Sequence, residues 1–570
     1  MTQPILVFEG VTKRFSGAAG PALEALDLTL EPGGIVGLFG PDGAGKTTLL
    51  RLAAGLLRPD AGKVVALGHD TRREAAAVQG AIGYMPQHFG LYEDLTVQEN
   101  LDLYADLQSL PRAERPQRYA ELLRLTALGP FGARLAGQLS GGMKQKLGLA
   151  CTLVRPPRLL LLDEPTVGVD PVSRRELWAI IERLVQEGGT TVLVSTAYLD
   201  EAQHCREVVL LREGKLIGQH QSAVFTAPLA GRVYMVPAGE GERRALQRSL
   251  ESASDVLDAL IQPEGVRLVL KEGGAPPAGA QPAAPRFEDA FVALLKPAGT
   301  GALPAAAVRR ADDPPSDGEV IRVQNLGRRF GSFEAVKGVS FAVRRGEVFG
   351  LLGANGAGKT TTFRMLCGLL PPSSGSLSVA GVDLRSAPAQ ARGHIGYVSQ
   401  KFSLYGNLSV EQNLGFFSSA YGLAGARRRE RMAWALAEFE LTPYRRVNAA
   451  DLPLGYKQRL ALASALMHEP DILFLDEPTS GVDPLARREF WQRINTLAAA
   501  GVTVLITTHF MEEAEYCDRL VLMSLGEVLA AGTPAQIRAR AAREDRLHPS
   551  MEDAFVELIE QHEAGLRSAA

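Results

Sequence analysis

The sequence predicts an α/β fold that occurs twice in tandem, each copy with a mainly parallel β-sheet covered by helices on both faces. The first observation is an internal repeat: residues 40–62, 82–101 and 159–171 recur as residues 353–375, 395–414 and 472–484. The second is that short apolar runs such as GGIVGLFG and RLLLLDEP alternate with helical segments in both copies. Buried strands separated by helices are typical of a parallel sheet.

The repeat divides the 570 residues into five parts. In the appendix that follows the first copy, RVYMVPA and VRLVLKE predict short strands around an amphipathic helix near residues 246–260. The repeat reaches the tail as well, since FEDAFVALL resembles MEDAFVELI. We expect the first copy at 1–222, the α+β appendix at 223–295, a flexible Ala/Pro/Gly-rich linker at 296–318, the second copy at 319–536 and a helical tail at 537–570.

Composition excludes several classes of protein. Apolar residues make up 46% of the chain, and 61 basic and 64 acidic residues leave a net charge of −3, which offers no field for nucleic acid. The basic run 427–431 is interpreted as the solvated start of a helix. The start lacks the features of a signal peptide, and no stretch approaches the ~20 apolar residues that cross a bilayer. Four widely spaced cysteines fit a reducing cytosol rather than a zinc site or a disulfide framework: Cys151, Cys205, Cys367 and Cys517.

A glycine-rich loop in each copy follows an apolar strand and opens a helix. Glycines let backbone N–H groups close on phosphates, the helix N-terminus adds positive dipole, a lysine reaches the β- and γ-phosphates, and a threonine hydroxyl ligates Mg²⁺. Two such loops argue against a merely structural role. The predicted ATP-binding residues are Gly40, Pro41, Asp42, Gly43, Ala44, Gly45, Lys46, Thr47 and Thr48, and Gly353, Ala354, Asn355, Gly356, Ala357, Gly358, Lys359, Thr360 and Thr361.

An Asp-Glu pair ends another apolar strand in each copy, as Asp163-Glu164 and as Asp476-Glu477. Beside the nucleotide, the aspartate can hold Mg²⁺ directly or through water. The glutamate can accept a proton from the attacking water. The alternative is that the pair only caps the following turn. The predicted Mg²⁺ ligands so far are Thr47, Asp163, Thr360 and Asp476.

These motifs resemble those of the ABC ATPases over nearly the whole chain, and the two copies are called cassette one and cassette two below. The resemblance implies that Gln87 and Gln400 belong to the glutamine loop, which senses Mg²⁺ and contacts the transport partner. Phe15 and Phe330 look like the aromatic residue that stacks on adenine, a contact of ~1–3 kcal/mol by analogy with base stacking. Packing of these two rings in the core is the alternative.

The signature LSGGMKQ is also present, at 139–145. In the family, cassettes pair head to tail, so the resemblance implies that Ser140, Gly141 and Gly142 close over the γ-phosphate bound by the other cassette. A glycine-rich helix start suits this role because it offers N–H groups to an anion. Asp170 and Asp483 match the loop that crosses between cassettes.

Two departures from the family pattern carry information. Cassette one has Ala197 where the switch histidine belongs, whereas cassette two has His509. In cassette two Pro453 and Leu454 replace the first Ser-Gly of the signature, and proline lacks even a backbone N–H. With head-to-tail pairing both defects fall in one ATP site, unless the changes are neutral. The complete site would then combine Lys359, Asp476, Glu477 and His509 with Ser140, Gly141 and Gly142.

Sequence features outside the ATP site distinguish several kinds of ABC protein. A ribosome-associated translation factor typically carries a charged linker and two intact signatures, whereas this chain has an Ala/Pro/Gly-rich linker and one broken signature. DNA-repair and iron–sulfur ABC proteins need cysteine clusters, and the four cysteines of this chain are widely spaced. A fused sugar importer is disfavoured by GVDP, by Met-Glu-Glu-Ala after the switch histidine and by the EDAFV tail. These features resemble ATPases of ABC-2 type exporters of drugs and polysaccharides, and the fused layout resembles bacterial tandem ATPases of multidrug or cation efflux.

The resemblance implies an ATPase that uses ATP and Mg²⁺ and drives two separate ABC-2 type permease subunits. We expect the chain to be cytoplasmic and peripheral on the inner face of the membrane. The docking groove is expected near 89–92 and 402–405. Cargo, permease identity and transport direction stay open.

Overall fold

The computed structural model of the protein describes residues 3–16, 20–87, 90–296, 318–385, 387–400, 403–544 and 546–569. They divide into two compact units. Unit 1 contains the described residues up to 230, residues 284–296 and residues 483–485. Unit 2 contains residues 231–283 and the described residues from 318 onward apart from 483–485. The predicted linker lies, except for its end residues 296 and 318, outside the described residues.

The centre of unit 1 is a six-stranded sheet in the order β10-β9-β3-β8-β7-β6, parallel except for the pair β9–β10. Every residue of β3, β7 and β8 is buried, as expected for strands covered on both faces. A second, antiparallel sheet has the order β2-β1-β4-β5. The strands are β1 (Leu6–Lys13), β2 (Leu23–Leu30), β3 (Ile35–Phe39), β4 (Ala61–Ala66), β5 (His69–Asp70), β6 (Ile82–Met85), β7 (Leu159–Asp163), β8 (Thr191–Ser195), β9 (Glu207–Arg212) and β10 (Lys215–His220).

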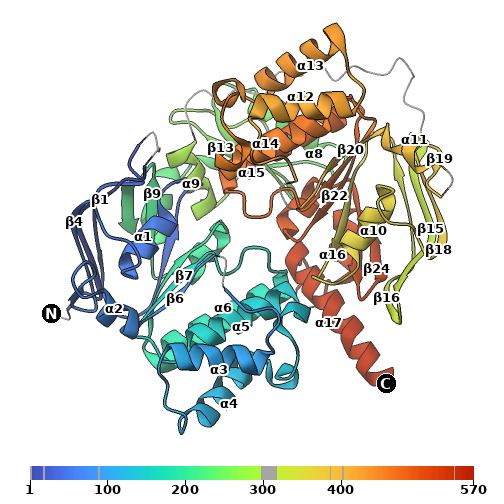
Figure 1. The fold of residues 1–570 in the computed structure, drawn as a ribbon. Coiled ribbons are helices and arrows are strands. Elements are labelled where there is room, and N and C mark those ends of the chain that lie inside the picture. Colours follow the sequence, from blue (N-terminus) through green and yellow to red (C-terminus); the bar gives the residue numbers. More distant parts are fainter. Residues whose placement is uncertain are drawn as a thin grey trace. The chain divides into compact units, whose positions relative to one another are not determined.

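The helices of unit 1 fall into two groups. Helix α1 follows β3 at the glycine-rich loop, while α3, α4 and α5 gather into a helical region at a distance from the antiparallel strands (Figure 1). The helices are α1 (Lys46–Ala53), α2 (Ala75–Ala81), α3 (Val97–Leu107), α4 (Arg115–Leu125), α5 (Gly141–Thr152), α6 (Pro171–Gly188), α7 (Ser222–Thr226) and α9 (Phe287–Leu295), with short 3-10 helices η1 (Gly129–Phe131), η2 (Ala136–Gln138), η3 (Leu199–His204) and η4 (Ala227–Leu229).

Cassette two in unit 2 repeats this plan, with the sheets β20-β21-β22-β17-β23-β24 and β16-β15-β18-β19. The two tandem α/β cassettes confirm the predicted fold class. The strands are β15 (Glu319–Phe330), β16 (Phe333–Arg344), β17 (Val348–Gly353), β18 (Ser374–Val379), β19 (Val382–Asp383), β20 (Ile395–Val398), β21 (Ile472–Asp476), β22 (Thr503–Thr508), β23 (Arg519–Ser524) and β24 (Glu527–Gly532).

Helices α12–α15 of cassette two lie together on one side of its parallel sheet, and the antiparallel sheet lies apart from them (Figure 1). The helices are α10 (Lys359–Leu366), α11 (Pro388–Arg392), α12 (Val410–Ala420), α13 (Gly425–Glu438), α14 (Leu454–Ala465), α15 (Pro484–Ala499), α16 (Pro534–Arg540) and α17 (Met551–Ala569), with 3-10 helices η5 (Thr442–Tyr444), η6 (Ala449–Asp451) and η7 (Met511–Tyr516).

Between the cassettes in sequence lies a small antiparallel sheet in the order β12-β13-β11-β14, which carries one helix. Its elements are β11 (Val233–Pro237), α8 (Arg243–Glu251), β12 (Val256–Gln262), β13 (Gly265–Leu270) and β14 (Gln281–Pro282). The prediction of one helix near 246–260 was therefore wrong in its second half. The apolar residues of β12 are buried by pairing with β13, and this tertiary contact overrides the local helical pattern.

The basic run 427–431 of cassette two is not solvated throughout, contrary to the expectation from the sequence. It lies near the start of α13, but the Arg431 side chain is buried and donates to the carbonyl oxygens of Met467 (3.1 Å) and Leu466 (2.8 Å). Its guanidinium also stacks over the Trp434 ring, 3.8 Å from the centroid. Within the described ranges, no helix is both long and apolar enough to span a bilayer.

Candidate active site

The two glycine-rich loops hold their lysines in the same way. In cassette one, Lys46 Nζ donates to the carbonyl oxygens of Gly40 (2.8 Å) and Pro41 (3.2 Å). In cassette two, Lys359 Nζ donates to Gly353 O (2.7 Å) and Ala354 O (3.1 Å). Both lysines are buried. The loop backbone thus keeps each ammonium group inside the concavity in which the phosphates are expected.

Glycine is required immediately before each of these helices. Gly45 has φ 102° and Gly358 has φ 93°, in the left-handed region that favours glycine. A Cβ at Gly45 would lie 2.5 Å from the carbonyl oxygen of Ala22, and one at Gly358 would lie 2.6 Å from that of Ala335. The chain can therefore turn from strand into helix with its N–H groups facing the loop only if these positions lack a side chain.

The aspartates at the ends of β7 and β21 are buried beside hydroxyl groups. Asp163 Oδ1 accepts from Thr47 Oγ1 (3.2 Å) and Ser195 Oγ (2.8 Å). Asp476 Oδ1 accepts from Thr507 Oγ1 (2.6 Å). Burial raises the pKa of Asp476 above its ordinary value. Asp163 is thus held at the start of α1, and Asp476 is held against the end of β22.

Each following glutamate is held by the glutamine of its cassette. Gln87 Nε2 donates to Glu164 Oε2, and Gln400 Nε2 donates to Glu477 Oε2, both at 2.7 Å. The two glutamates adopt positive φ angles of 52° and 46°, a backbone conformation uncommon for residues other than glycine. Their side chains contact site residues across 77 positions of sequence, which favours the catalytic interpretation over turn capping.

The two sites differ at the switch position. His509 Nδ1 lies 3.4 Å from Glu477 Oε2, an ion-pair distance that falls short of good hydrogen-bond geometry. Burial raises the pKa of Glu477, but the nearby His509 and Lys359 outweigh it and hold the pKa at about 2. In cassette one the corresponding side chain is the buried methyl group of Ala197, which carries neither charge nor donor.

The signature helices differ in the same residues as the sequence indicates. Ser140 caps α5, and its hydroxyl oxygen accepts from the backbone N–H of Met143 (3.3 Å). In cassette two the cap position of α14 is Pro453, which has neither a hydroxyl nor an N–H group. A Cβ at Gly142 would lie 2.2 Å from Ser173 Oγ, so this glycine is also needed for packing against α6.

The proposed adenine-stacking rings lie outside the core. Phe15 is 44% exposed and Phe330 is 45% exposed. Cationic side chains flank both: Lys13 Nζ is 5.6 Å from the Phe15 centroid, and the Arg328 guanidinium is 4.7 Å from that of Phe330. The partial exposure of these rings, just after β1 and at the end of β15, contradicts the core-packing alternative.

The remaining sequence predictions are placed as follows. Asp170 caps α6, with Oδ1 accepting from Ser173 N (3.1 Å). At the expected docking region, Tyr92 is 57% exposed and Tyr405 is 46% exposed, while residues 89 and 402 lie outside the described residues. The other predicted loop residues run from the end of β3 into the first turn of α1 and from Gly353, the last residue of β17, into the first turn of α10.

Sequence reasoning missed a second group of polar residues at the ends of β8 and β22. Besides donating to the aspartates, the hydroxyl oxygens of Ser195 and Thr507 accept from the backbone N–H groups of Glu164 and Glu477, at 3.0 and 2.9 Å. One residue later, Thr508 Oγ1 donates to Glu513 Oε2 (2.6 Å). Their recurrence as VLVST and VLITT was a signal that could have identified them.

The oxygen donors fit Mg²⁺. Asp163 Oδ2 is buried and has no hydrogen-bond partner among the described residues, so a cation would satisfy it. Within the described part of the chain, no group of three or more His, Cys, Asp or Glu side chains could hold a metal ion. Mg²⁺ usually binds through one or two carboxylates together with phosphate oxygens and water. The donor set therefore suits magnesium that arrives with a nucleotide.

Comparisons with known proteins identify the family of this chain. A family model described as ABC transporter matches residues 23–167 and 336–480. Over 570 residues the chain is 52% identical to "Probable multidrug ABC transporter ATP-binding protein YbhF" of Escherichia coli, covering 98% of each protein. It is 42% identical over 238 residues to "Nod factor export ATP-binding protein I" of Ralstonia nicotianae, covering 40% of this chain and 73% of that protein. A solved "Structure of ATP binding subunit of ABC transporter" is 33% identical, covers 42% of this chain and 99% of its own, and has a TM-score of 0.39.

Proposed function

This chain belongs to the ATP-binding proteins of ABC transporters and hydrolyses ATP for transport, and from that premise we propose that it powers an exporter of the ABC-2 type. The observation that carries the export proposal is the full-length match to a protein named for multidrug transport. The match of one cassette to a Nod factor export protein supports the same direction of transport. The cargo is proposed to be a drug or another small molecule.

The complete site is proposed to use the residues around Glu477. Its carboxylate is ionised at neutral pH, because, against the effect of burial, His509 and Lys359 hold its pKa at about 2, and it is proposed to orient the attacking water and to accept its proton as the bond to the γ-phosphate forms. Gln400 and Thr507 fix that carboxylate and its backbone. His509, 3.4 Å from the carboxylate, is proposed to stabilise charge on the γ-phosphate, and Lys359 to bind the β- and γ-phosphates.

The asymmetry of the two cassettes supports one complete and one degenerate ATP site. We expect the head-to-tail pairing of the family, in which the signature of cassette one serves the nucleotide of cassette two. Ser140 then joins Glu477 and His509 in one site. The other site combines Ala197 with Pro453 and so lacks both a switch imidazole and a signature hydroxyl. That site is proposed to bind ATP without supporting fast turnover.

The metal proposed for each site is Mg²⁺, held by Thr47, Asp163 and Gln87 in cassette one and by Thr360, Asp476 and Gln400 in cassette two. When bound, it neutralises charge on the β- and γ-phosphates. Chelation with excess EDTA should abolish hydrolysis, and added Mg²⁺ should restore it. Full turnover in EDTA would refute the assignment of these oxygen donors to a metal.

The partners are proposed to be two separate permease subunits, with the chain peripheral on the cytoplasmic face of the membrane. The test is affinity purification of the tagged chain from detergent-solubilised membranes, followed by ATPase assays with and without the co-purified protein. A membrane protein that raises the ATPase rate several-fold is the expected result. Salt-resistant association with ribosomes, without a membrane partner, would refute the exporter assignment in favour of a translation factor.

A further inference from the structure

Residues 231–283 of the predicted appendix, to which the name appendix refers from here on, leave and re-enter the cassette-one chain, yet they pack with cassette two. Residues 231–283 belong to unit 2, whereas the segments on either side belong to unit 1. The returning helix α9 is fixed in unit 1, because the Phe287 ring packs edge-on against Phe39 (4.9 Å between centroids) and Phe225 (5.8 Å). Residues 231–283 are therefore an insertion in the cassette-one chain that folds with cassette two.

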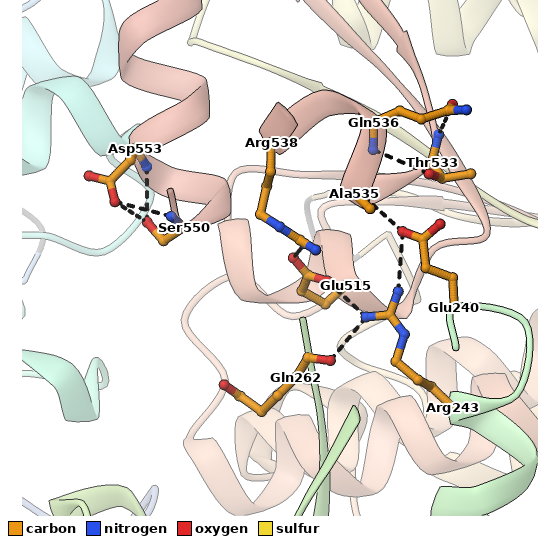
Figure 2. A network of polar contacts seen from close by, with 10 residues as sticks. All are labelled: Glu240, Arg243, Gln262, Glu515, Thr533, Ala535, Gln536, Arg538, Ser550 and Asp553. Carbon is orange, nitrogen blue, oxygen red and sulfur yellow. Dashed lines mark hydrogen bonds and ion pairs between the residues drawn. The ribbon is translucent and has the colours of Figure 1, made fainter. Parts of the chain in front are cut away.

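A buried network of charged side chains attaches residues 231–283 to cassette two (Figure 2). Arg243, at the start of α8, has a side chain only 3% exposed, and its Nη1 lies 3.1 Å from Glu515 Oε2 on η7. Glu515 also pairs with Arg538 of α16. Arg243 Nη2 lies 3.3 Å from Glu240 Oε1, which in turn accepts from the backbone N–H of Ala535 (2.7 Å). Separating the two segments is costly, because the buried Glu515 carboxylate would lose one of its two arginine partners and Arg243 would lose its contact with that carboxylate.

Polar contacts between helices extend this attachment. Along α8, Gln247 Oε1 accepts from Asn495 Nδ2 of α15 (3.0 Å), and Gln247 Nε2 donates to Ala259 O (2.9 Å). One turn later, Glu251 Oε1 accepts from Gln492 Nε2 (2.9 Å). Gln247 and Asn495 are both buried. The α8–α15 contact therefore has a defined register.

Further pairs lie on either side. Arg244 pairs with Asp518, and Arg488 of α15 pairs with the buried Asp258 of β12. The apolar side chain of Ile261, 2% exposed, belongs to the same core cluster as residues of β17 and α15 in cassette two. The appendix thus shares a hydrophobic core with cassette two as well as a polar interface, which is how parts of one folded domain pack.

The surface that receives the appendix is particular to cassette two. At the position of Glu515, cassette one has Gln203, which is exposed. Gln492 and Asn495 are replaced by Ala179 and Glu182 at the equivalent positions of α6. Cassette one lacks these three side-chain functions, so its sequence does not encode a second copy of this interface.

We propose that residues 231–283 form an intramolecular clasp by which the cassette-one chain holds cassette two without nucleotide and without the linker at 296–318. The clasp has two consequences. The cassettes stay joined at every stage of the ATP cycle, and a break in the linker does not release them.

The test uses the full chain with a site for a sequence-specific protease inserted in the linker near residue 306. After cleavage in EDTA without nucleotide, the two fragments are separated by size exclusion and their affinity is measured by dilution. We expect them to co-elute as one complex. Arg243→Ala with Gln247→Ala should weaken their association at least about a hundredfold, because the buried Glu515 loses one of its two arginine partners and the buried Asn495 loses its hydrogen-bond acceptor.

A matched control and a second variant make the test specific. Arg248→Ala changes an exposed arginine on the same helix and should leave the complex intact. Gln492→Ala with Asn495→Ala alters only the cassette-two side, so it weakens association without touching the appendix fold. Separation of the unmutated fragments would overturn the clasp. Retention of full affinity by both double variants, or an equal loss in Arg248→Ala, would also overturn it.

Discussion

Replacing Glu477 by glutamine should nearly abolish steady-state hydrolysis, whereas Glu164→Gln should change it little. Both substitutions keep an oxygen that can accept from the glutamine 2.7 Å away, so the local hydrogen bond survives in each cassette. Each removes the carboxylate that can accept a proton. The two variants are therefore matched, and they differ in the residue at the switch position. His509 lies 3.4 Å from Glu477, whereas cassette one has Ala197, which carries no imidazole, at the corresponding position.

The expected loss of hydrolysis rate in each variant follows from the contribution of a general base to catalysis. Loss of a positioned base costs ~10²–10⁴ in rate, or about 2.7–5.4 kcal/mol at 1.36 kcal/mol per tenfold change. If the Glu477 site performs nearly all turnover, Glu477→Gln lowers the total rate by that whole factor. Glu164→Gln should then lower it by less than about twofold, since its site already lacks groups worth ~10²–10³ each.

The assay is phosphate release at saturating Mg·ATP, with the permease present where turnover depends on it. ATP binding to each variant is measured separately, so that a lost rate is not mistaken for lost affinity. Equal losses in the two variants would refute the asymmetric assignment, and a larger loss in Glu164→Gln would reverse it.

Four further outcomes are expected. Ser140→Ala should lower the hydrolysis rate about as strongly as a substitution in the ATP site of cassette two. Because it also removes a helix cap worth ~0.5–2 kcal/mol, thermal unfolding is measured beside activity. A hydrolysis rate near that of the unmutated protein would contradict head-to-tail pairing. Lys46→Ala should weaken ATP binding at the degenerate site more than it slows single-turnover chemistry, as nucleotide titration would reveal. A Gly/Ser segment replacing 296–318 should leave the ATPase rate within a few-fold, and a collapse would reveal an unrecognised role for the linker. Arg431→Ala should lower the free energy of unfolding by about 2–3 kcal/mol in denaturant titration, whereas exposed Arg429→Ala should change it by less than about 0.5 kcal/mol.

Much of the site could be predicted because its chemistry is local in sequence. The turn from strand to helix needs glycine at Gly45 and Gly358, and the lysine and threonine follow directly on the helix. The Asp-Glu pairs follow runs of apolar strand residues, so their position at the carboxyl end of the strand follows from the strand's own boundary. An internal repeat then shows each motif twice, which separates a functional pattern from coincidence.

The contacts that complete the site could not be predicted in this way. Gln87 reaches Glu164 across 77 residues, and Ser195 reaches Asp163 across 32, because neighbouring strands of a parallel sheet bring their carboxyl ends together. Likewise, only the structure decides between exposure and burial for Phe15, Phe330 and similar apolar residues near strand ends.

The sequence by itself determined the two α/β cassettes, the phosphate-binding loops and the difference between His509 and Ala197, since each depends on short runs of residues whose chemistry is self-contained. Tertiary structure alone decided that 256–262 is a strand and that the appendix packs with cassette two. The physical reason is that a side chain becomes buried only when another part of the chain packs against it, and the two parts can be far apart in sequence. Arg243 and Glu515 are 272 residues apart, and neither side chain has a reason to be buried until the other lies beside it.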